Sequence, residues 1–423
     1  MYLRKLELKD FRGFASLQWE VAEGEEAGWH VLMGPNGVGK TSVLRGMAIG
    51  LLGSKEFEVM RQGHQKFIRA SCNSAQVRSE LLMSSHWDIS VPVSFEYVKV
   101  MRGMDITPVE RWASVRVEQD TENAPERKKI DFSGFSAGFG PMRRFTGGNS
   151  DTEKLFQSHP RPACHLSLFG EDIALSEVLE WLKTLRFQQL ESSPDSPEGM
   201  LLDLVRDFVN QDGFLPYGAQ LGEVGSKDVS FIDGNGVTLP ILELSDGYRA
   251  VLSLTFELIR QMADCYGAER LFSADKRQIV APGVVLIDEV DAHLHPSWQR
   301  QIGPWLTRLF PQVQFIVTTH SPYVCQSATR GSVWVLPAPG EEGHLRRLEG
   351  DALHRALYGD VLHVLNSEAF GGQPGRSDVA LAKLDRLTKL NRKHERGTLS
   401  DAERQEREAL LALLAPVLDV GHA

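Results

Sequence analysis

Cysteine is scarce in this sequence. The chain of 423 residues contains four cysteines, and no two of them form a Cys-x-x-Cys pair. Wide spacing of this kind argues against a zinc site or a disulfide framework and is typical of a reducing compartment. We therefore expect a cytoplasmic protein. The cysteines are Cys72, Cys164, Cys265 and Cys325.

Long apolar runs and an excess of basic charge are also lacking. No run of about 18 apolar residues occurs, so we expect no membrane span, and the first 14 residues alternate charged and apolar side chains, unlike a signal peptide. The formal net charge of -10 argues against a generally basic nucleic-acid-binding surface. A local basic groove stays possible, because binding follows the local field.

Strands and helices alternate over most of the chain, which indicates an α/β fold with a mostly parallel core sheet covered on both faces. The alternation of the first 33 residues predicts an N-terminal antiparallel lobe. We predict strands at 2–9, 17–21, 29–33, 91–100, 111–119, 283–289, 314–320 and 332–336. We predict helices at 40–52, 171–190, 200–210, after the segment ELSDGYR and from Ser297 onward.

The last segment differs in pattern from the rest. Residues 1–340 are expected to form one head with a compact α+β insertion at about 55–240, and residues 350–423 a C-terminal helical hairpin. Its first helix is basic, with seven positive and three negative charges between Arg376 and Arg396. Such a hairpin covers a sheet edge or docks a partner, and the sequence favours neither role.

A phosphate-binding loop is the most specific motif. Residues 34–41 read GPNGVGKT and match G-x-x-x-x-G-K-[ST] after an apolar strand and before a helix. In this motif backbone N–H groups surround phosphates, Lys40 reaches the β- and γ-phosphates, and Thr41 ligates Mg²⁺. The predicted nucleotide contacts are Gly34, Pro35, Asn36, Gly37, Gly39, Lys40, Thr41 and Ser42.

Two acids end the apolar strand VVLIDE. Asp288 is the expected second residue of the Mg²⁺ site, and Glu289 is the expected general base that polarises the attacking water. The pair His293 and His295 follows, but it lacks convergent Cys or carboxylate ligands, so we interpret it as structural and not as a metal site.

Two further segments complete the candidate site. His320 ends the strand QFIVTTH, where a histidine can hydrogen-bond a γ-phosphate, although a buried structural histidine is the simpler interpretation. Ser245 and Gly247 open a helix at LSDGYR, where a hydroxyl and an N–H group can bind an anion or simply cap the helix.

The order GPNGVGKTS, LSDGYR, LIDEVDAHLHP and TTHSP, with FRGF near the start, resembles the ABC/SMC-type heads of SMC, Rad50 and RecF proteins, a class of AAA family ATPases. The resemblance implies ATP and Mg²⁺ as cofactors and a homodimer, or a higher oligomer of dimers, that closes around nucleotide. It implies that Ser245 and Gly247 bind the partner's γ-phosphate, that Asp291 lies in a loop at the dimer interface, and that His320 is a switch histidine.

The sequence departs from that pattern in three places. Tyr248 replaces the usual glutamine of the signature. The glutamine loop is not securely placed, since Gln62 and the segment 140–144 are both candidates. No heptad repeat separates the phosphate loop from the signature, so the long coiled coil of SMC proteins is absent.

Within that class the chain looks most like the ATPase subunits of Septu-type and retron-associated antiphage defence systems, and like relatives of OLD nucleases. This implies a regulatory ATPase whose effector is a separate nuclease, with an HNH-type subunit as the expected partner. Contact with DNA or with retron RNA–DNA is also implied. Residues 349–351 read EGD, as at the start of a Toprim domain, but no acidic strand ends follow.

Two other functions stay open. A RecF-like DNA-maintenance ATPase would need a basic groove, and a transporter subunit fits less well with the large insertion and the FRGF segment. The candidate groove residues are Arg127, Lys128, Lys129, Arg143, Arg144, Arg346 and Arg347.

Overall fold

Two compact units make up the chain, Met1–Val364 and Leu365–Ala423. The computed structural model describes residues 1–60, 64–85, 88–101, 107–108, 134–141, 158–170, 176–191, 197–215, 218–225, 228–337, 345–361, 364 and 377–418. Among these, no helix is long and apolar enough to cross a membrane.

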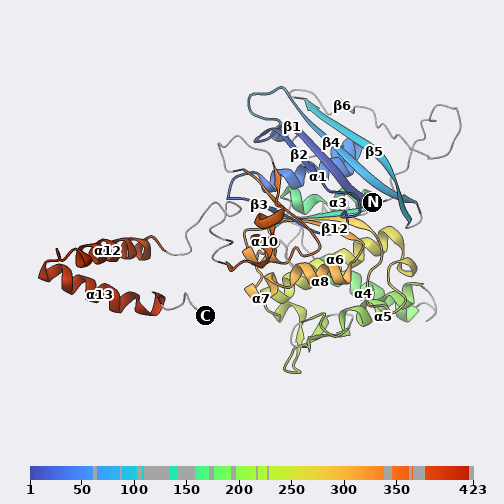
Figure 1. Ribbon diagram of the computed structural model, residues 1–423. Helices are drawn as coiled ribbons and strands as arrows, with labels where there is room; N and C mark the ends of the chain where they lie inside the picture. Colours follow the sequence, from blue (N-terminus) through green and yellow to red (C-terminus); the bar gives the residue numbers. More distant parts are fainter. Residues whose placement is uncertain are drawn as a thin grey trace. The chain divides into compact units, whose positions relative to one another are not determined.

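A six-stranded sheet forms the centre of the first unit (Figure 1). Its order is β14-β13-β3-β12-β11-β7, and only β14 runs antiparallel. Every residue of β3, β12 and β11 is buried, as expected for parallel strands covered on both faces. The bounds are β3 (Gly28–Met33), β7 (Phe135–Phe139), β11 (Gly283–Ile287), β12 (Val313–Thr318), β13 (Gly331–Val335) and β14 (Arg346–Arg347).

An antiparallel sheet in the order β2-β1-β4-β5-β6 forms a second layer. Helix α1 (Lys40–Val59) contacts β1, β4 and β5 of this sheet and β11, β12 and β7 of the other, so it lies between them (Figure 1). Its helical geometry is interrupted at Gly53. The bounds are β1 (Tyr2–Phe11), β2 (Phe14–Glu20), β4 (Ser74–Ser85), β5 (Asp88–Met101) and β6 (Thr107–Pro108).

The stretch predicted as an insertion contributes to both sheets. Strands β4 to β6 extend the N-terminal antiparallel lobe, and β7 forms an edge of the core sheet. The outer edge of β7 is not left open, because the N–H groups of Phe135, Gly138 and Gly140 donate to Tyr266, Cys164 and Ser167. The segment is therefore part of the head architecture.

Helices and a small sheet of β10-β9-β8 complete the first unit. Helix α10 packs against α9 and belongs to this unit, although the sequence grouped residues from 350 with the hairpin. The bounds are β8 (Gln220–Val224), β9 (Val229–Ile232), β10 (Thr238–Pro240), α3 (Pro160–Ala163), α4 (Ser176–Glu191), α5 (Pro197–Val209), α6 (Asp246–Tyr266), α7 (Pro296–Gln299), α8 (Ile302–Leu309), α9 (Pro322–Gln326) and α10 (Gly350–Tyr358).

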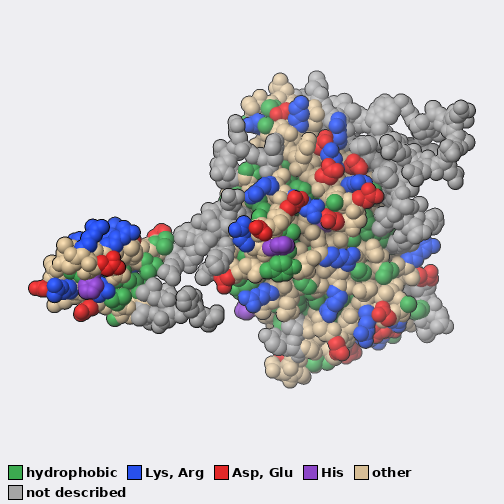
Figure 2. Space-filling view, in the orientation of Figure 1, with side chains coloured by type: hydrophobic (Ala, Val, Ile, Leu, Met, Phe, Trp, Pro, Cys, Tyr) green, Lys and Arg blue, Asp and Glu red, His purple; other side chains and the backbone are tan. Residues whose placement is uncertain are grey.

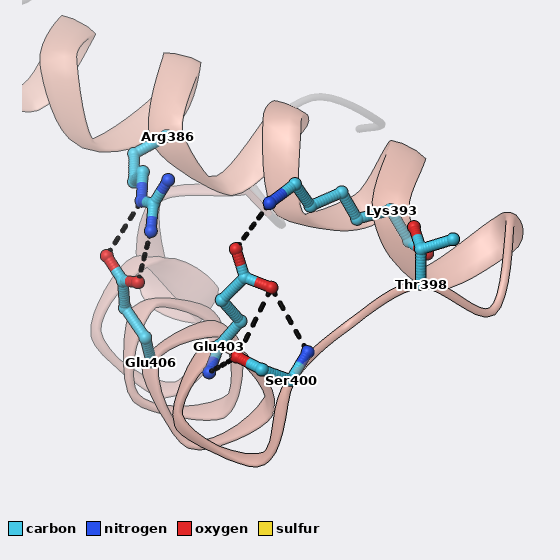
Figure 3. Close-up of polar contacts among 6 residues, drawn as sticks. All are labelled: Arg386, Lys393, Thr398, Ser400, Glu403 and Glu406. Atoms are coloured by element: carbon cyan, nitrogen blue, oxygen red, sulfur yellow. Dashed lines mark hydrogen bonds and ion pairs between the residues drawn. The ribbon is translucent and has the colours of Figure 1, made fainter.

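The second unit is a hairpin of α12 (Asp378–Glu395) and α13 (Asp401–Leu418). Leu387 and Leu390 of α12 and Leu414 of α13 are buried. Ion pairs link the two helices near their connection, where Arg386 binds both oxygens of Glu406 and Lys393 binds Glu403 (Figure 3). Lys and Arg side chains gather along α12 in Figure 2, which agrees with the basic charge of its sequence.

The predicted α/β fold with a mostly parallel core sheet, an antiparallel N-terminal lobe and C-terminal helices is confirmed. Strands β4 and β7 and the small β8–β10 sheet were missed. β7 to β10 are only three to five residues long, and the 12 residues of β4 mix polar and apolar side chains. The helix expected from Ser297 is two shorter helices. The strand expected at 111–119 lies outside the described residues, as does Gln62.

Candidate functional site at the carboxyl edge of the core sheet

The phosphate loop joins the end of β3 at Met33 to the start of α1 at Lys40. Gly39 precedes the helix with a left-handed backbone at φ 99°. A β-carbon on Gly39 would lie 2.7 Å from Cζ of Phe14, whose ring packs against the loop. Both the backbone angle and this close approach therefore require glycine at this position.

Lys40 is buried beneath the loop, with 7% of its surface exposed. Its Nζ donates to the carbonyl oxygens of Gly34 at 2.7 Å and Pro35 at 3.0 Å. Burial lowers the pKa of Lys40 to about 8, against the opposing influence of the nearby acids Asp288, Glu289 and Asp291. Burying this charged ammonium group is energetically unfavourable, and the carbonyl groups of the loop hold it in place.

The order β3-β12-β11 brings the loop and the acids together. These strands are parallel, so their carboxyl ends meet at one edge of the sheet. There the Thr41 hydroxyl donates to Oδ2 of Asp288 at 2.7 Å, across 247 positions of sequence. Asp288 is 3% exposed.

Glu289 follows Asp288 directly, but Glu289 is exposed whereas Asp288 is buried. Its backbone is left-handed, with φ 46°, an uncommon conformation for a residue with a β-carbon. A tight turn thus separates a buried acid from an exposed one. The buried carboxylate is suited to binding a cation, and the exposed one is suited to accepting a proton from a water molecule.

His320 and Asp291 lie at the same edge. The Thr319 hydroxyl donates to Oδ1 of Asp291 at 2.5 Å, and the N–H of His320 donates to the same oxygen at 3.4 Å. The pKa of His320 is lowered, chiefly by burial and then by the charge of Lys40. His320 is therefore a neutral side chain beside the phosphate loop at neutral pH.

Ser245 and Gly247 open α6. Ser245 is exposed, and its side chain makes no capping hydrogen bond with the helix. A β-carbon on Gly247 would lie 3.8 Å from the carbonyl oxygen of His293, so the signature packs against the loop that follows the two acids. No hydrogen bond in the described part of the chain links Ser245 or Gly247 to the phosphate loop.

The remaining candidates separate into structural contacts and undescribed segments. His295 caps α7, because its side chain accepts from the N–H of Ser297. Arg347 pairs with Glu25 at 2.6 Å, and acidic and basic side chains are interspersed on the visible face of the head (Figure 2). The candidates at 127–129 and 142–144 lie outside the described residues.

One candidate for the glutamine loop begins beside the acids. Gly140 and Pro141 follow β7, and β7 is the parallel neighbour of β11. The N–H of Asp288 donates to the carbonyl of Phe139 at 2.8 Å. The segment from Gly140 therefore leaves the sheet at the same edge as Asp288.

The donor set fits a magnesium nucleotide. Thr41 and Asp288 place a hydroxyl and a carboxylate oxygen within 2.7 Å of each other, and Mg²⁺ prefers such oxygen ligands with phosphates and water for the rest. Gly37 has a positive φ of 81° and open space where a β-carbon would lie, which leaves the loop accessible to a phosphate. Among the described residues, no group of three or more His, Cys, Asp or Glu could hold a metal ion.

Sequence reasoning missed Thr318, the last residue of β12. Its hydroxyl donates to Oδ1 of Asp288 at 2.6 Å and accepts the N–H of Glu289 at 2.8 Å. The available signal in the sequence was the pair of threonines that follows the mostly apolar strand QFIV. The role of these threonines depends on β12 lying between β3 and β11, and the sequence does not show which strands are neighbours.

The buried charge of Lys40 predicts a pH dependence of stability. Its folded pKa of about 8 is below the ordinary 10.5, so the unfolded chain binds more protons between these values and stability rises with pH there. Relative to Lys40→Met, the nucleotide-free wild type should gain on the order of 2 kcal/mol between pH 7 and 10. Urea unfolding of both proteins at several pH values measures this. A constant difference would contradict it.

The chain is similar to known proteins in part of its sequence and in its fold. Residues 148–326 match the family described as "AAA domain, putative AbiEii toxin, Type IV TA system". This match includes the signature, both acids and His320, and it leaves the phosphate loop outside. Among solved structures, an SMC head bound to the C-winged helix domain of ScpA has a TM-score of 0.46 at 15% identity, covering 82% of this chain and 98% of that one. RecF has a TM-score of 0.43 at 13% identity, covering 82% and 98%.

Three curated relatives are similar in sequence. Septu protein PtuA of Bacillus mycoides is 25% identical over 79% of this chain and 40% of its own length. The Retron Ec83 probable ATPase of Escherichia coli is 41% identical over 25% of this chain and 18% of its own. The Retron Vc95 probable ATPase of Vibrio cholerae is 23% identical over 79% and 73%. The chain thus spans less than half of the first two. The predicted resemblance is confirmed at this level, because the chain is similar in sequence to Septu protein PtuA and to proteins named as probable retron ATPases.

Proposed function

We propose that this protein binds ATP with Mg²⁺, hydrolyses it, and uses the nucleotide state to regulate a separate effector. One observation carries the proposal: a phosphate loop with a buried lysine and a hydroxyl–carboxylate pair meet at one edge of a parallel sheet. Similarity to two proteins named as probable retron ATPases supports the same chemistry. Thr41 and Asp288 would hold Mg²⁺, which when bound would neutralise phosphate charge.

The roles of the residues follow from their surroundings. Lys40 would release the carbonyls of the loop and bind phosphate oxygens, which offer a charged partner for its buried ammonium. Exposed Glu289 would accept a proton from water, and neutral His320 would donate a hydrogen bond to the γ-phosphate. All three residues belong to segments at the carboxyl edge of the core sheet.

Dimerisation is the proposed source of the remaining contacts. Ser245 is exposed at the N-terminus of a 21-residue helix, and its hydroxyl makes no capping hydrogen bond. Among the described residues, it makes no hydrogen bond with the phosphate loop of its own chain. We infer that Ser245 and Gly247 complete the nucleotide site of a second copy, as the ABC-type resemblance implies.

The proposed effector is a nuclease on a separate chain, as the resemblance to Septu-type and retron-associated defence systems implies. The hairpin of α12 and α13 is a candidate docking element, since it forms a compact unit of its own. A RecF-like role on DNA is the alternative. It is less favoured because Arg347, one of the candidate groove residues, is engaged by Glu25.

The general base is tested with Glu289→Gln, which keeps the shape of the side chain but removes its basicity. We expect ATP binding to persist, hydrolysis to fall by about a hundredfold or more, and closed dimers to accumulate. Phosphate release and light scattering measure these effects. Lys40→Ala should lose ATP binding, and Glu408→Gln, an exposed acid of α13, should behave as wild type. Wild-type hydrolysis by Glu289→Gln would refute the assignment.

The second-copy contact is tested with Ser245→Arg in the Glu289→Gln background. A bulky cation at this helix start should block closure, so the ATP-dependent dimer disappears while each chain still binds ATP. Thr388→Arg, an exposed site on α12, is the matched control. Dimers that form normally with Ser245→Arg would remove the proposed contact.

The effector is tested by purifying the native complex and determining its mass and composition. We expect a nuclease subunit whose cutting depends on the bound nucleotide. A chain ending at residue 364 tests the hairpin, since loss of the subunit from this variant implicates α12 and α13. Salt-dependent duplex binding by the chain alone, with no nuclease recovered, would support the DNA-maintenance alternative instead.

A further inference from the structure

The carboxyl end of β12 lies between the two halves of the proposed ATP site. β12 pairs with β3, which leads into the phosphate loop, and with β11, which leads into the two acids. Its last residue, Thr318, is fully buried, with 0% of its surface exposed. A hydroxyl at this position is therefore surrounded by the groups that hold the site.

The Thr318 hydroxyl makes two hydrogen bonds with defined directions. It accepts the N–H of Glu289 at 2.8 Å, so its own hydrogen is available for the carboxylate of Asp288, with Oδ1 at 2.6 Å. A hydroxyl has one hydrogen to donate, and here it is directed at Asp288. The carbonyl of the same residue also accepts the N–H of Val290 at 3.0 Å.

The two oxygens of the Asp288 carboxylate have different hydrogen-bond partners. Oδ1 faces Thr318, whereas Oδ2 faces the hydroxyl of Thr41. Two donors on opposite oxygens prevent the carboxylate from rotating. The Thr41 oxygen keeps its lone pairs for a cation, because it acts as the donor toward Asp288.

The same hydroxyl holds the turn that carries Glu289. With φ at 46°, Glu289 has a strained backbone and needs surrounding contacts to persist. Its N–H points at Thr318, and the next N–H points at the Thr318 carbonyl. Thr318 is thus in contact with the turn that separates the buried acid from the exposed one.

We propose that Thr318 is a positioning residue that orients both the Mg²⁺-site carboxylate of Asp288 and the turn of the general base Glu289. The inference rests on the proposed ATPase function and assigns a role to a residue outside its phosphate loop, signature and acids. Thr319 differs, because its hydroxyl binds Asp291 and not Asp288. The two neighbouring threonines thus provide a matched comparison.

The experiment uses the full-length protein with Thr318→Val, which keeps the side-chain shape and removes the hydroxyl, and Thr318→Ser, which restores the hydroxyl. ATP binding is measured by calorimetry in EDTA and during a titration with Mg²⁺. We expect Thr318→Val to raise the half-saturating Mg²⁺ concentration about tenfold, with binding in EDTA changed less than about twofold. Thr318→Ser should restore the wild-type Mg²⁺ requirement, and Thr319→Val should retain it.

If Thr318→Val does not fold, as judged by its thermal melting, Thr318→Cys keeps the volume with only a weak donor and should show the same direction of change. A wild-type Mg²⁺ requirement in Thr318→Val or Thr318→Cys overturns the inference. An equal shift in Thr319→Val also overturns it, because the effect would then be general to the strand end. If the wild-type protein itself shows no Mg²⁺-dependent ATP binding, the proposed function fails, and the inference fails with it.

Discussion

The parallel order β3-β12-β11 is the constraint on which the site depends. It brings three strand ends from distant parts of the chain to one edge, where Thr41 meets Asp288 and Thr318 meets both acids. Any slip in this pairing would separate the hydroxyls from the carboxylate, since neighbouring residues of a strand point to opposite faces. The buried apolar residues of these strands therefore hold the chemistry in register.

Several features of the site lower the stability of the fold. Lys40 is buried with a lowered pKa, Glu289 has a left-handed backbone, and Gly39 leaves a space into which the Phe14 ring fits. Such features persist only when surrounding structure stabilises them. Here that structure is the layer in which α1 lies between two sheets. It supplies the apolar burial that offsets a strained, charged loop.

The residues assigned to the proposed chemistry all lie in the first unit, and the hairpin of α12 and α13 forms the second. The hairpin is held by a few buried leucines and by ion pairs such as Arg386 with Glu406. Exposed ion pairs of this kind add little stability. They do fix which faces of α12 and α13 meet, and so which charged side chains stay exposed to solvent.

Sequence alone predicted the phosphate loop and the two acids, because GPNGVGKT and LIDE place particular residue types at spacings that only a few functions need. The core strands were equally readable, since continuous apolar runs predict buried parallel strands. The place of β7 as an edge strand, the contact of Phe14 with Gly39 and the role of Thr318 were decided by tertiary structure alone. Each depends on which strands become neighbours, and strand order is set by packing across the whole sheet and not by any local pattern.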